Sequence, residues 1–370
     1  MDHPYFNNPF RVLLILGAFF VFTLPLVVVA PVSTVGWFWF QQAYMVAIGL
    51  SHFVITGALY LNSKTLAYFS STPTNKLIYY VIPPVIFIGL GSVGFFSLIP
   101  IINQAVVIDG RAIGFIVYIM VLRSLDHFHV VRQSFGILQI FARSSGLSLP
   151  GWMRNTASWL FLALFAMQML TFWNGVEQGN PGKGTYQADN PLVQLLTLVA
   201  VGLFLAQLVG FTMAKSGSDR KLRVLLPIAY LHLQGASAAL VVYKVEFYLA
   251  SLAMHYVEYL IIMHPRIFQV PLGNQPVDSV MGWLRRKPMV FYSILLGLAV
   301  FAGNGGSLLA EIAPASLAAL FLLNLFNGLT ITHFFVDGFL WKFRKPYFRE
   351  TLVPLYFPAP TRGKRRNENK

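Results

Sequence analysis

Long apolar segments recur along almost the whole chain, and most charged residues lie between them. Hydrophobic residues make up 56% of the 370 residues and charged residues only 11%, whereas soluble domains carry about 25% charged residues. A segment of about 20 apolar residues can cross a bilayer as a helix. The sequence therefore predicts an all-α fold, a polytopic transmembrane helix bundle of about ten spans at residues 12–34, 37–62, 76–102, 112–140, 155–174, 191–214, 222–243, 245–263, 288–310 and 314–341.

Basic residues are distributed unevenly over the segments that connect these predicted spans. With the N-terminus inside, the cytoplasmic segments hold 22 of the 27 lysines and arginines, and the outer loops hold three. This positive-inside bias predicts a multi-pass membrane protein with both termini in the cytoplasm. We expect one transmembrane domain over 1–341 and a basic cytoplasmic tail over 342–370. The bias also explains the net charge of +14 without nucleic acid as a partner.

Five histidines lie on five different predicted spans at nearly the same depth. Each is roughly 8 to 13 residues from the cytoplasmic end of its span, or about 12–20 Å at 1.5 Å per residue. Carboxylates accompany three of them, and ionisable groups inside a bilayer are costly and usually functional. Such a layer is typical of a buried metal site, for which the expected ligands are His52, His129, His232, His255, Glu258, His333 and Asp337.

The predicted span at 112–140 contains the densest group of polar residues. At 100° per residue, one helix face about 120° wide carries Asp126, His129, Arg132 and Gln133. We expect Asp126 to orient a ligand or to bind the metal, and Arg132 and Gln133 to hold an anionic substrate group or supply hydrogen bonds. An internal ion pair between Asp126 and an arginine of the bundle is the alternative.

Two other spans place a histidine and a carboxylate on one face. His255 and Glu258 are three residues apart, a spacing found in di-iron and di-manganese helical bundles. His333 and Asp337 are four apart, so the aspartate can bind the metal or orient a histidine. The remaining histidine, His232, has the least support and could equally hydrogen-bond another helix.

Two stretches, Phe128-His-Val-Val-Arg-Gln-Ser-Phe-Gly136 and His333-Phe-Phe-Val-Asp-Gly-Phe-Leu-Trp341, resemble motifs of uncharacterised bacterial multi-span proteins. This first resemblance implies a location in a bacterial inner membrane. In ligand type and placement, the isolated histidines also resemble those of the Brp/Blh membrane β-carotene dioxygenases, which coordinate iron with intramembrane histidines. That resemblance implies oxygen chemistry on a carotenoid-like substrate, and no site residue is carried over from it. The clustered histidine boxes of membrane desaturases and alkane hydroxylases are absent from the sequence.

The ligand types restrict the metal and the reaction. Imidazole and carboxylate suit Fe, Zn, Mn or Cu, and the chain has no cysteine to supply a thiolate. We expect a divalent metal, Fe before Zn or Mn, in a non-haem oxygenase or related oxidoreductase that takes a lipid, isoprenoid or carotenoid from the bilayer. Two alternatives stay open: a haem-b electron-transfer protein with bis-histidine ligation, and a proton-coupled transporter with a His/Asp/Glu/Arg relay.

Overall fold

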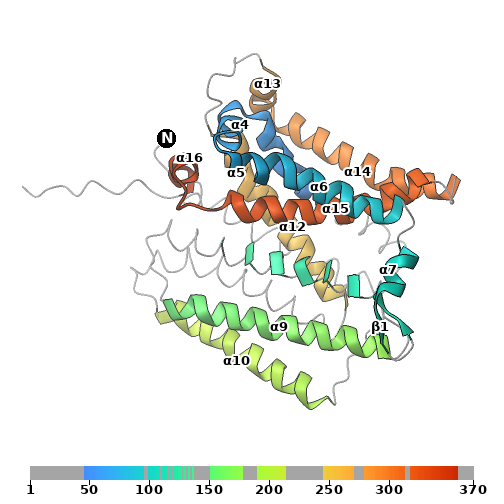
Figure 1. The fold of residues 1–370 in the computed structure, drawn as a ribbon. Coiled ribbons are helices and arrows are strands. Elements are labelled where there is room, and N and C mark those ends of the chain that lie inside the picture. The colour runs from blue at the N-terminus through green and yellow to red at the C-terminus, as the bar shows by residue number, and fades with distance from the viewer. Residues whose placement is uncertain are drawn as a thin grey trace, which may run out of the picture.

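The described part of the chain is almost entirely helical (Figure 1). The computed structural model describes residues 46–95, 99–108, 111–114, 117–118, 121–122, 124–126, 128–130, 132–133, 136, 151–177, 190–213, 245–270, 279–312 and 317–356. The predicted all-α class is therefore correct for these residues, apart from one small antiparallel ribbon in which Val107 pairs with Ala112 and Ile108 with Arg111. In the sequence the two strands are separated by Asp109-Gly110, a dipeptide that favours tight hairpins.

Where the predicted apolar segments are described, nearly all of their residues are helical, while the helices Ser63–Phe69, Val280–Arg286 and Pro346–Tyr356 lie outside those segments. The predicted spans at 12–34 and 222–243 lie outside the described residues. The elements, in chain order, are α3 (Leu50–Ile55), η3 (Thr56–Leu61), α4 (Ser63–Phe69), α5 (Pro73–Lys76), η4 (Leu77–Val81), α6 (Ile82–Phe95), α7 (Ile99–Ala105), β1 (Val107–Ile108), β2 (Arg111–Ala112), α9 (Gly151–Glu177), α10 (Pro191–Met213), α12 (Val245–Phe268), α13 (Val280–Arg286), α14 (Pro288–Ile312), α15 (Leu317–Leu340) and α16 (Pro346–Tyr356).

A helix that crosses a membrane by itself must be about 20 residues long and predominantly apolar. Among the described residues, no single helix is both long and apolar enough to cross. Two bent helix pairs meet the requirements jointly: Val46–Leu61 with Ser63–Phe69, bent by 89°, and Val280–Arg286 with Pro288–Asn304, bent by 108°.

Both bends have a local origin in the sequence. At the first, the Asn62 side chain accepts a hydrogen bond from the Thr65 backbone N–H at 3.2 Å, so a new helix starts there. The predicted span at 37–62 ends at this residue. At the second, Pro288 occupies the first position of α14, where the missing N–H of proline is not needed.

Helices α6 and α15 pack closely because a glycine lies at their contact. A Cβ added to Gly328 would lie 2.5 Å from the backbone oxygen of Phe87. One turn further along α15, the Thr332 hydroxyl donates to the backbone oxygen of Pro83 at 3.3 Å. Small residues and hydroxyls at a helix contact are typical of closely packed bundles, in membranes as elsewhere.

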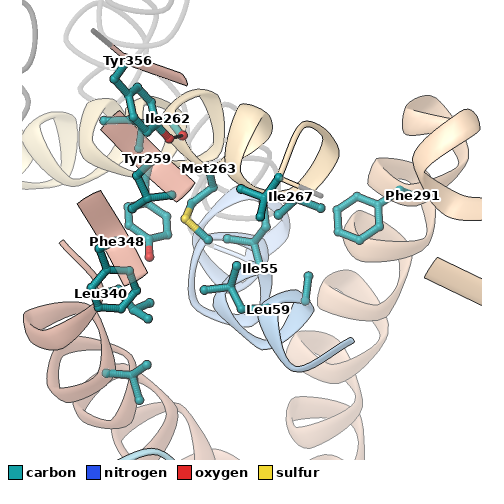
Figure 2. Close-up of a cluster of buried hydrophobic side chains, with 14 of the residues drawn as sticks. Ile55, Leu59, Tyr259, Ile262, Met263, Ile267, Phe291, Leu340, Phe348 and Tyr356 are labelled. Atoms are coloured by element: carbon teal, nitrogen blue, oxygen red, sulfur yellow. Dashed lines mark hydrogen bonds between the residues drawn. The ribbon is translucent and has the colours of Figure 1, made fainter. Parts of the chain in front are cut away.

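The largest hydrophobic core among the described residues joins α3, η3, α4, η4, α12, α13, α14, α15 and α16, and it includes Met153 of α9; Figure 2 shows part of it. Tyr259 and Met263 of α12 lie beside Ile55 in this core. Helix α16, within the segment expected to form the basic tail, is part of the same core: Phe348 is fully buried, and the Tyr356 hydroxyl donates to the Ile262 backbone oxygen at 2.6 Å. The α12–α15–α16 packing therefore lies on the C-terminal side of His255 in α12 and of His333 in α15.

Helices α9 and α10 form a second pair, which lies to one side of the others (Figure 1). Their contact is a separate apolar cluster of Ala163, Met167, Val193 and Ala200. None of the predicted ligands lies on this pair, so the candidate site belongs to the larger group of helices.

Candidate metal centre

Four of the five predicted histidines converge on one point between the helices. They come from α3, from the helical residues 128–130, from α12 and from α15. The ring centroids of His52 lie 4.4 Å from His333, 4.6 Å from His255 and 6.4 Å from His129. The His129 ring lies 5.1 Å from both His255 and His333. The fifth histidine, His232, lies outside the described residues.

All four imidazoles are removed from solvent. Their residues are 0% (His52), 8% (His129), 1% (His255) and 2% (His333) exposed. Aromatic rings surround them: Phe334 stacks on His129 with centroids 4.2 Å apart. Histidines packed among aromatic rings need partners for their ring nitrogens, because an unpaired buried polar group is costly.

Three of the histidines place their ring nitrogens close enough to share an ion. One nitrogen each of His52, His129 and His333 lies within 4.8 Å of the other two. Imidazole binds zinc at about 2.0–2.1 Å, so small side-chain rotations would bring the three nitrogens onto one ion. In the described part of the chain, His255 adjoins this group of three without being a member of it.

Several of these nitrogens have no hydrogen-bond partner among the described residues. They are Nε2 of His129 and His333 and both ring nitrogens of His52 and His255. More than about 90% of buried polar groups in proteins are hydrogen-bonded, and a group of exceptions calls for an explanation such as a bound ion. A neutral imidazole has one bare lone pair, so each of these buried rings can offer one nitrogen to a cation.

A chain of buried hydrogen bonds leads away from the cluster. His333 Nδ1 and the Thr56 hydroxyl are 3.0 Å apart, and the same hydroxyl lies 3.0 Å from the Tyr259 hydroxyl. Tyr259 donates to Asp337 Oδ1 at 2.7 Å. Trp341 Nε1 donates to the same oxygen at 2.6 Å. The chain links η3, α12 and α15 immediately beside the histidines.

Each of the three polar residues in this chain follows a cluster histidine by four positions. Thr56 follows His52, Tyr259 follows His255, and Asp337 follows His333. Four residues of helix advance about 6 Å and return to nearly the same face. The histidines form one layer and their i+4 residues a second layer, so the three helices run in the same direction through the centre.

The other predicted site residues are placed as follows. Glu258, Asp126 and Gln133 are buried, at 1%, 8% and 9% exposure, on the elements that carry His255 and His129. Arg132 is exposed, and its guanidinium carbon lies 5.8 Å from the Phe128 ring centroid. On the helical wheel Arg132 lies at the edge of the predicted face, and it is exposed whereas the histidines are buried.

Asp337 contacts Tyr259 and Trp341, and is separated from the ring of His333 by the hydroxyls of Tyr259 and Thr56. Of the two roles expected for it, this placement fits the orienting role. Thr56 and Tyr259 were not predicted to have a role. The signal that could have found them is the shared i+4 spacing from a histidine.

No protein-family model, curated protein or solved structure matches this chain.

Proposed function

We propose that the cluster binds one divalent metal ion through His52, His129 and His333, and that the protein is a metal-dependent oxidoreductase of the membrane. The observation that carries the proposal is the set of three buried imidazoles with ring nitrogens within 4.8 Å of one another. Iron is the metal expected first, and zinc and manganese are compatible with the same ligands.

Three nitrogen ligands leave coordination positions open, which is typical of catalytic rather than structural metal sites. An iron ion bound there would supply oxygen or redox chemistry. The protein's own contribution is to hold the imidazoles and exclude water. His255, adjacent to His52 and His129, is placed either to complete the coordination or to face a reacting group.

The surroundings of the site favour an apolar substrate. Phe53 lies 5.4 Å from the His333 ring, Tyr256 lies 5.0 Å from the His52 ring, and Phe334 covers His129. Aromatic and aliphatic walls with a few polar groups are typical of sites for apolar small molecules. A lipid, an isoprenoid or a carotenoid-like molecule is the substrate class that we propose.

Exposed apolar side chains support a location in the membrane. Leu198 of α10 is 70% exposed, Val85 of α6 is 64% exposed and Phe301 of α14 is 79% exposed. Large exposed apolar surfaces are rare on soluble monomers and mark contact with lipid or another protein. The shared direction of α3, α12 and α15 also agrees with the spans assigned from charge, all of which run toward the cytoplasm.

A proton-coupled transporter is the second candidate function. The hydrogen-bonded chain from His333 to Asp337 favours it, because such chains of ionisable and hydroxyl groups can relay protons. A haem protein is less well supported by the geometry. A porphyrin between His52 and His129 would need the space that His255 and His333 occupy beside both rings.

The test is the metal content of detergent-purified protein, measured by mass spectrometry alongside its visible spectrum. The wild type is compared with His52→Ala and with His264→Ala. His264 lies on α12 outside the cluster, 3.2 Å from the Tyr292 hydroxyl, and serves as the matched control. We expect about one equivalent of metal in the wild type and the control, and its loss in His52→Ala. Wild-type protein that takes up no Fe(II), Zn²⁺ or Mn²⁺ would refute the proposal and favour the transporter.

A further inference from the structure

The hydrogen-bonded chain beside the cluster has a definite direction. An ionised carboxylate can only accept hydrogen bonds, so the Tyr259 hydroxyl uses its hydrogen on Asp337. The Tyr259 oxygen can then only accept from Thr56, and the Thr56 hydroxyl spends its single hydrogen on that bond. Thr56 is left as an acceptor toward His333 Nδ1, which must carry a hydrogen.

A neutral imidazole carries one N–H, and a hydrogen on Nδ1 leaves Nε2 with a bare lone pair. This Nε2 is the His333 nitrogen that has no hydrogen-bond partner among the described residues. The donor count in the hydrogen-bonded chain therefore gives the tautomer, and the nitrogen that it leaves bare is the one with no other partner among the described residues.

We infer that Thr56, Tyr259 and Asp337 are positioning residues that lock His333 as its Nδ1–H tautomer and present Nε2 to the centre. The role assigned to Nε2, binding the metal ion, rests on the proposed function. Partners that orient a metal-binding histidine and raise its basicity typically contribute about 10–100-fold in metal affinity. Here the orienting carboxylate acts through two hydroxyls, from neighbouring helices, instead of touching the imidazole.

The Asp337 end of the hydrogen-bonded chain is held by a second donor, so the carboxylate cannot rotate freely. Trp341 donates to the same Asp337 oxygen as Tyr259. The Trp341 ring is in turn covered by the Arg266 guanidinium, whose central carbon lies 5.0 Å from the ring centroid. Thr56 and Tyr259 are also fixed by burial, at 5% and 0% exposure. The arrangement of donors is therefore set by packing before any ion binds.

The tautomer is measured in metal-free, full-length protein labelled with ¹⁵N-histidine. Long-range ¹H–¹⁵N correlations identify which ring nitrogen carries the hydrogen, and the signals that disappear in His333→Gln belong to His333. We expect Nδ1–H in the wild type. In Tyr259→Phe the Thr56 hydroxyl is free to donate to Nδ1, so we expect the Nδ1–H form to lose its dominance.

Thr56→Val removes the hydroxyl that connects His333 to Tyr259, so the Nδ1–H form should again lose its dominance. Thr56→Ser keeps this hydroxyl and should give the wild-type signal. Two matched control variants each remove a hydroxyl that is not part of the hydrogen-bonded chain. Tyr60→Phe loses a bond to the Tyr79 backbone oxygen, and Thr65→Val loses a bond to the Tyr347 hydroxyl. Neither control should change the His333 signal. A change in the controls would indicate a general loosening of the fold, whereas a change in Tyr259→Phe and Thr56→Val alone indicates loss of the hydrogen-bonded chain.

Metal affinity is the second readout, measured by competition with a chelator using Zn²⁺ and Fe(II). We expect Tyr259→Phe and Thr56→Val to bind about 10–100-fold more weakly than the wild type, and Thr56→Ser to bind nearly as tightly. An Nε2–H tautomer in the wild type, or a tautomer unaffected by both substitutions, would overturn the inference. If the wild type has the Nδ1–H tautomer but binds no metal, the proposed function is refuted. The role of the hydrogen-bonded chain in fixing the tautomer would then still be supported.

Discussion

The imidazole rings of His52 and His333 lie 4.4 Å apart, although one belongs to the first described helix and the other to α15 near the end of the described chain. The Thr56 hydroxyl reinforces this contact through its 3.0 Å hydrogen bond to His333 Nδ1. The candidate centre is therefore a product of tertiary packing between distant segments. Substitutions that alter how α3, α12 and α15 meet should change metal binding even where they touch no ligand.

His255 should contribute less to metal affinity than the three histidines of the proposed site, His52, His129 and His333. We expect His129→Ala to abolish stoichiometric metal binding, because only two of the three converging nitrogens remain. His255→Ala should retain the ion with a weaker affinity, because His255 lies beside the group of three. Titration of metal-free variants with Zn²⁺ measures both. Equal losses for the two variants would indicate four equivalent ligands, and would contradict the three-histidine description.

Gly328 should be intolerant of a side chain. Its added Cβ would lie 2.5 Å from the Phe87 backbone oxygen, so Gly328→Ala must push α6 and α15 apart. Overpacking of this kind typically costs about 1–3 kcal/mol. The control is Gly338→Ala on the same helix, where a Cβ would meet nothing within 4 Å. Thermal unfolding in detergent should show a lower Tm for Gly328→Ala alone, and an unchanged Tm would contradict the close packing.

Arg266 should be sensitive even to replacement by lysine. It is 3% exposed, its guanidinium lies over the rings of Trp341 and Phe348, and Nη1 donates to the Leu340 backbone oxygen at 3.2 Å. A lysine ammonium cannot stack on both rings as a planar guanidinium does, and cation–π contacts contribute about 0.5–2 kcal/mol each. Arg266→Lys should lower the Tm by several degrees. Arg349→Lys, at an exposed position of α16, should leave it unchanged, and similar Tm values for the two variants would argue against the stacking.

The absence of cysteine from the sequence allows the membrane location to be tested with single spin labels. A label at Leu198→Cys on α10 should be reached by oxygen, which concentrates in lipid, and be protected from a water-soluble nickel reagent. A label at Arg349→Cys should show the opposite preference. The accessibility of each label to oxygen and to the nickel reagent is measured by electron paramagnetic resonance on protein in lipid vesicles. A nickel-accessible label at position 198 would contradict contact between α10 and lipid.

The common depth of the histidines in a bilayer stays a prediction. The sequence correctly predicted the helical class of the described residues, because long apolar segments favour helices. It could not predict that His52, His129, His255 and His333 are neighbours, because depth along a helix contains no information on which helices pack together. Arg132 shows the limit of a helical wheel: it lies at the edge of the predicted face, and the packing of the helices leaves it exposed.

Asp337 shows a different limit of the sequence. Its spacing from His333 permitted either metal binding or orientation of a histidine, and the choice depends on Tyr259, which comes from another helix. The i+4 spacing shared by Thr56, Tyr259 and Asp337 was visible in the sequence, but the pattern acquires meaning only once the three helices are known to run in the same direction. Their hydrogen bonds are therefore a property of the packing.

The most direct measurement is X-ray absorption at the metal edge of the purified wild type and of His333→Ala. Three imidazole nitrogens bound to one ion should give a nitrogen or oxygen shell at about 2.0–2.1 Å for zinc, with the outer-shell scattering that is characteristic of imidazole rings. The expected fit contains three imidazoles in the wild type, and the imidazole contribution should be lost with the ion in His333→Ala. A bound metal without imidazole scattering, or an unchanged spectrum in the variant, would contradict a metal centre at these histidines.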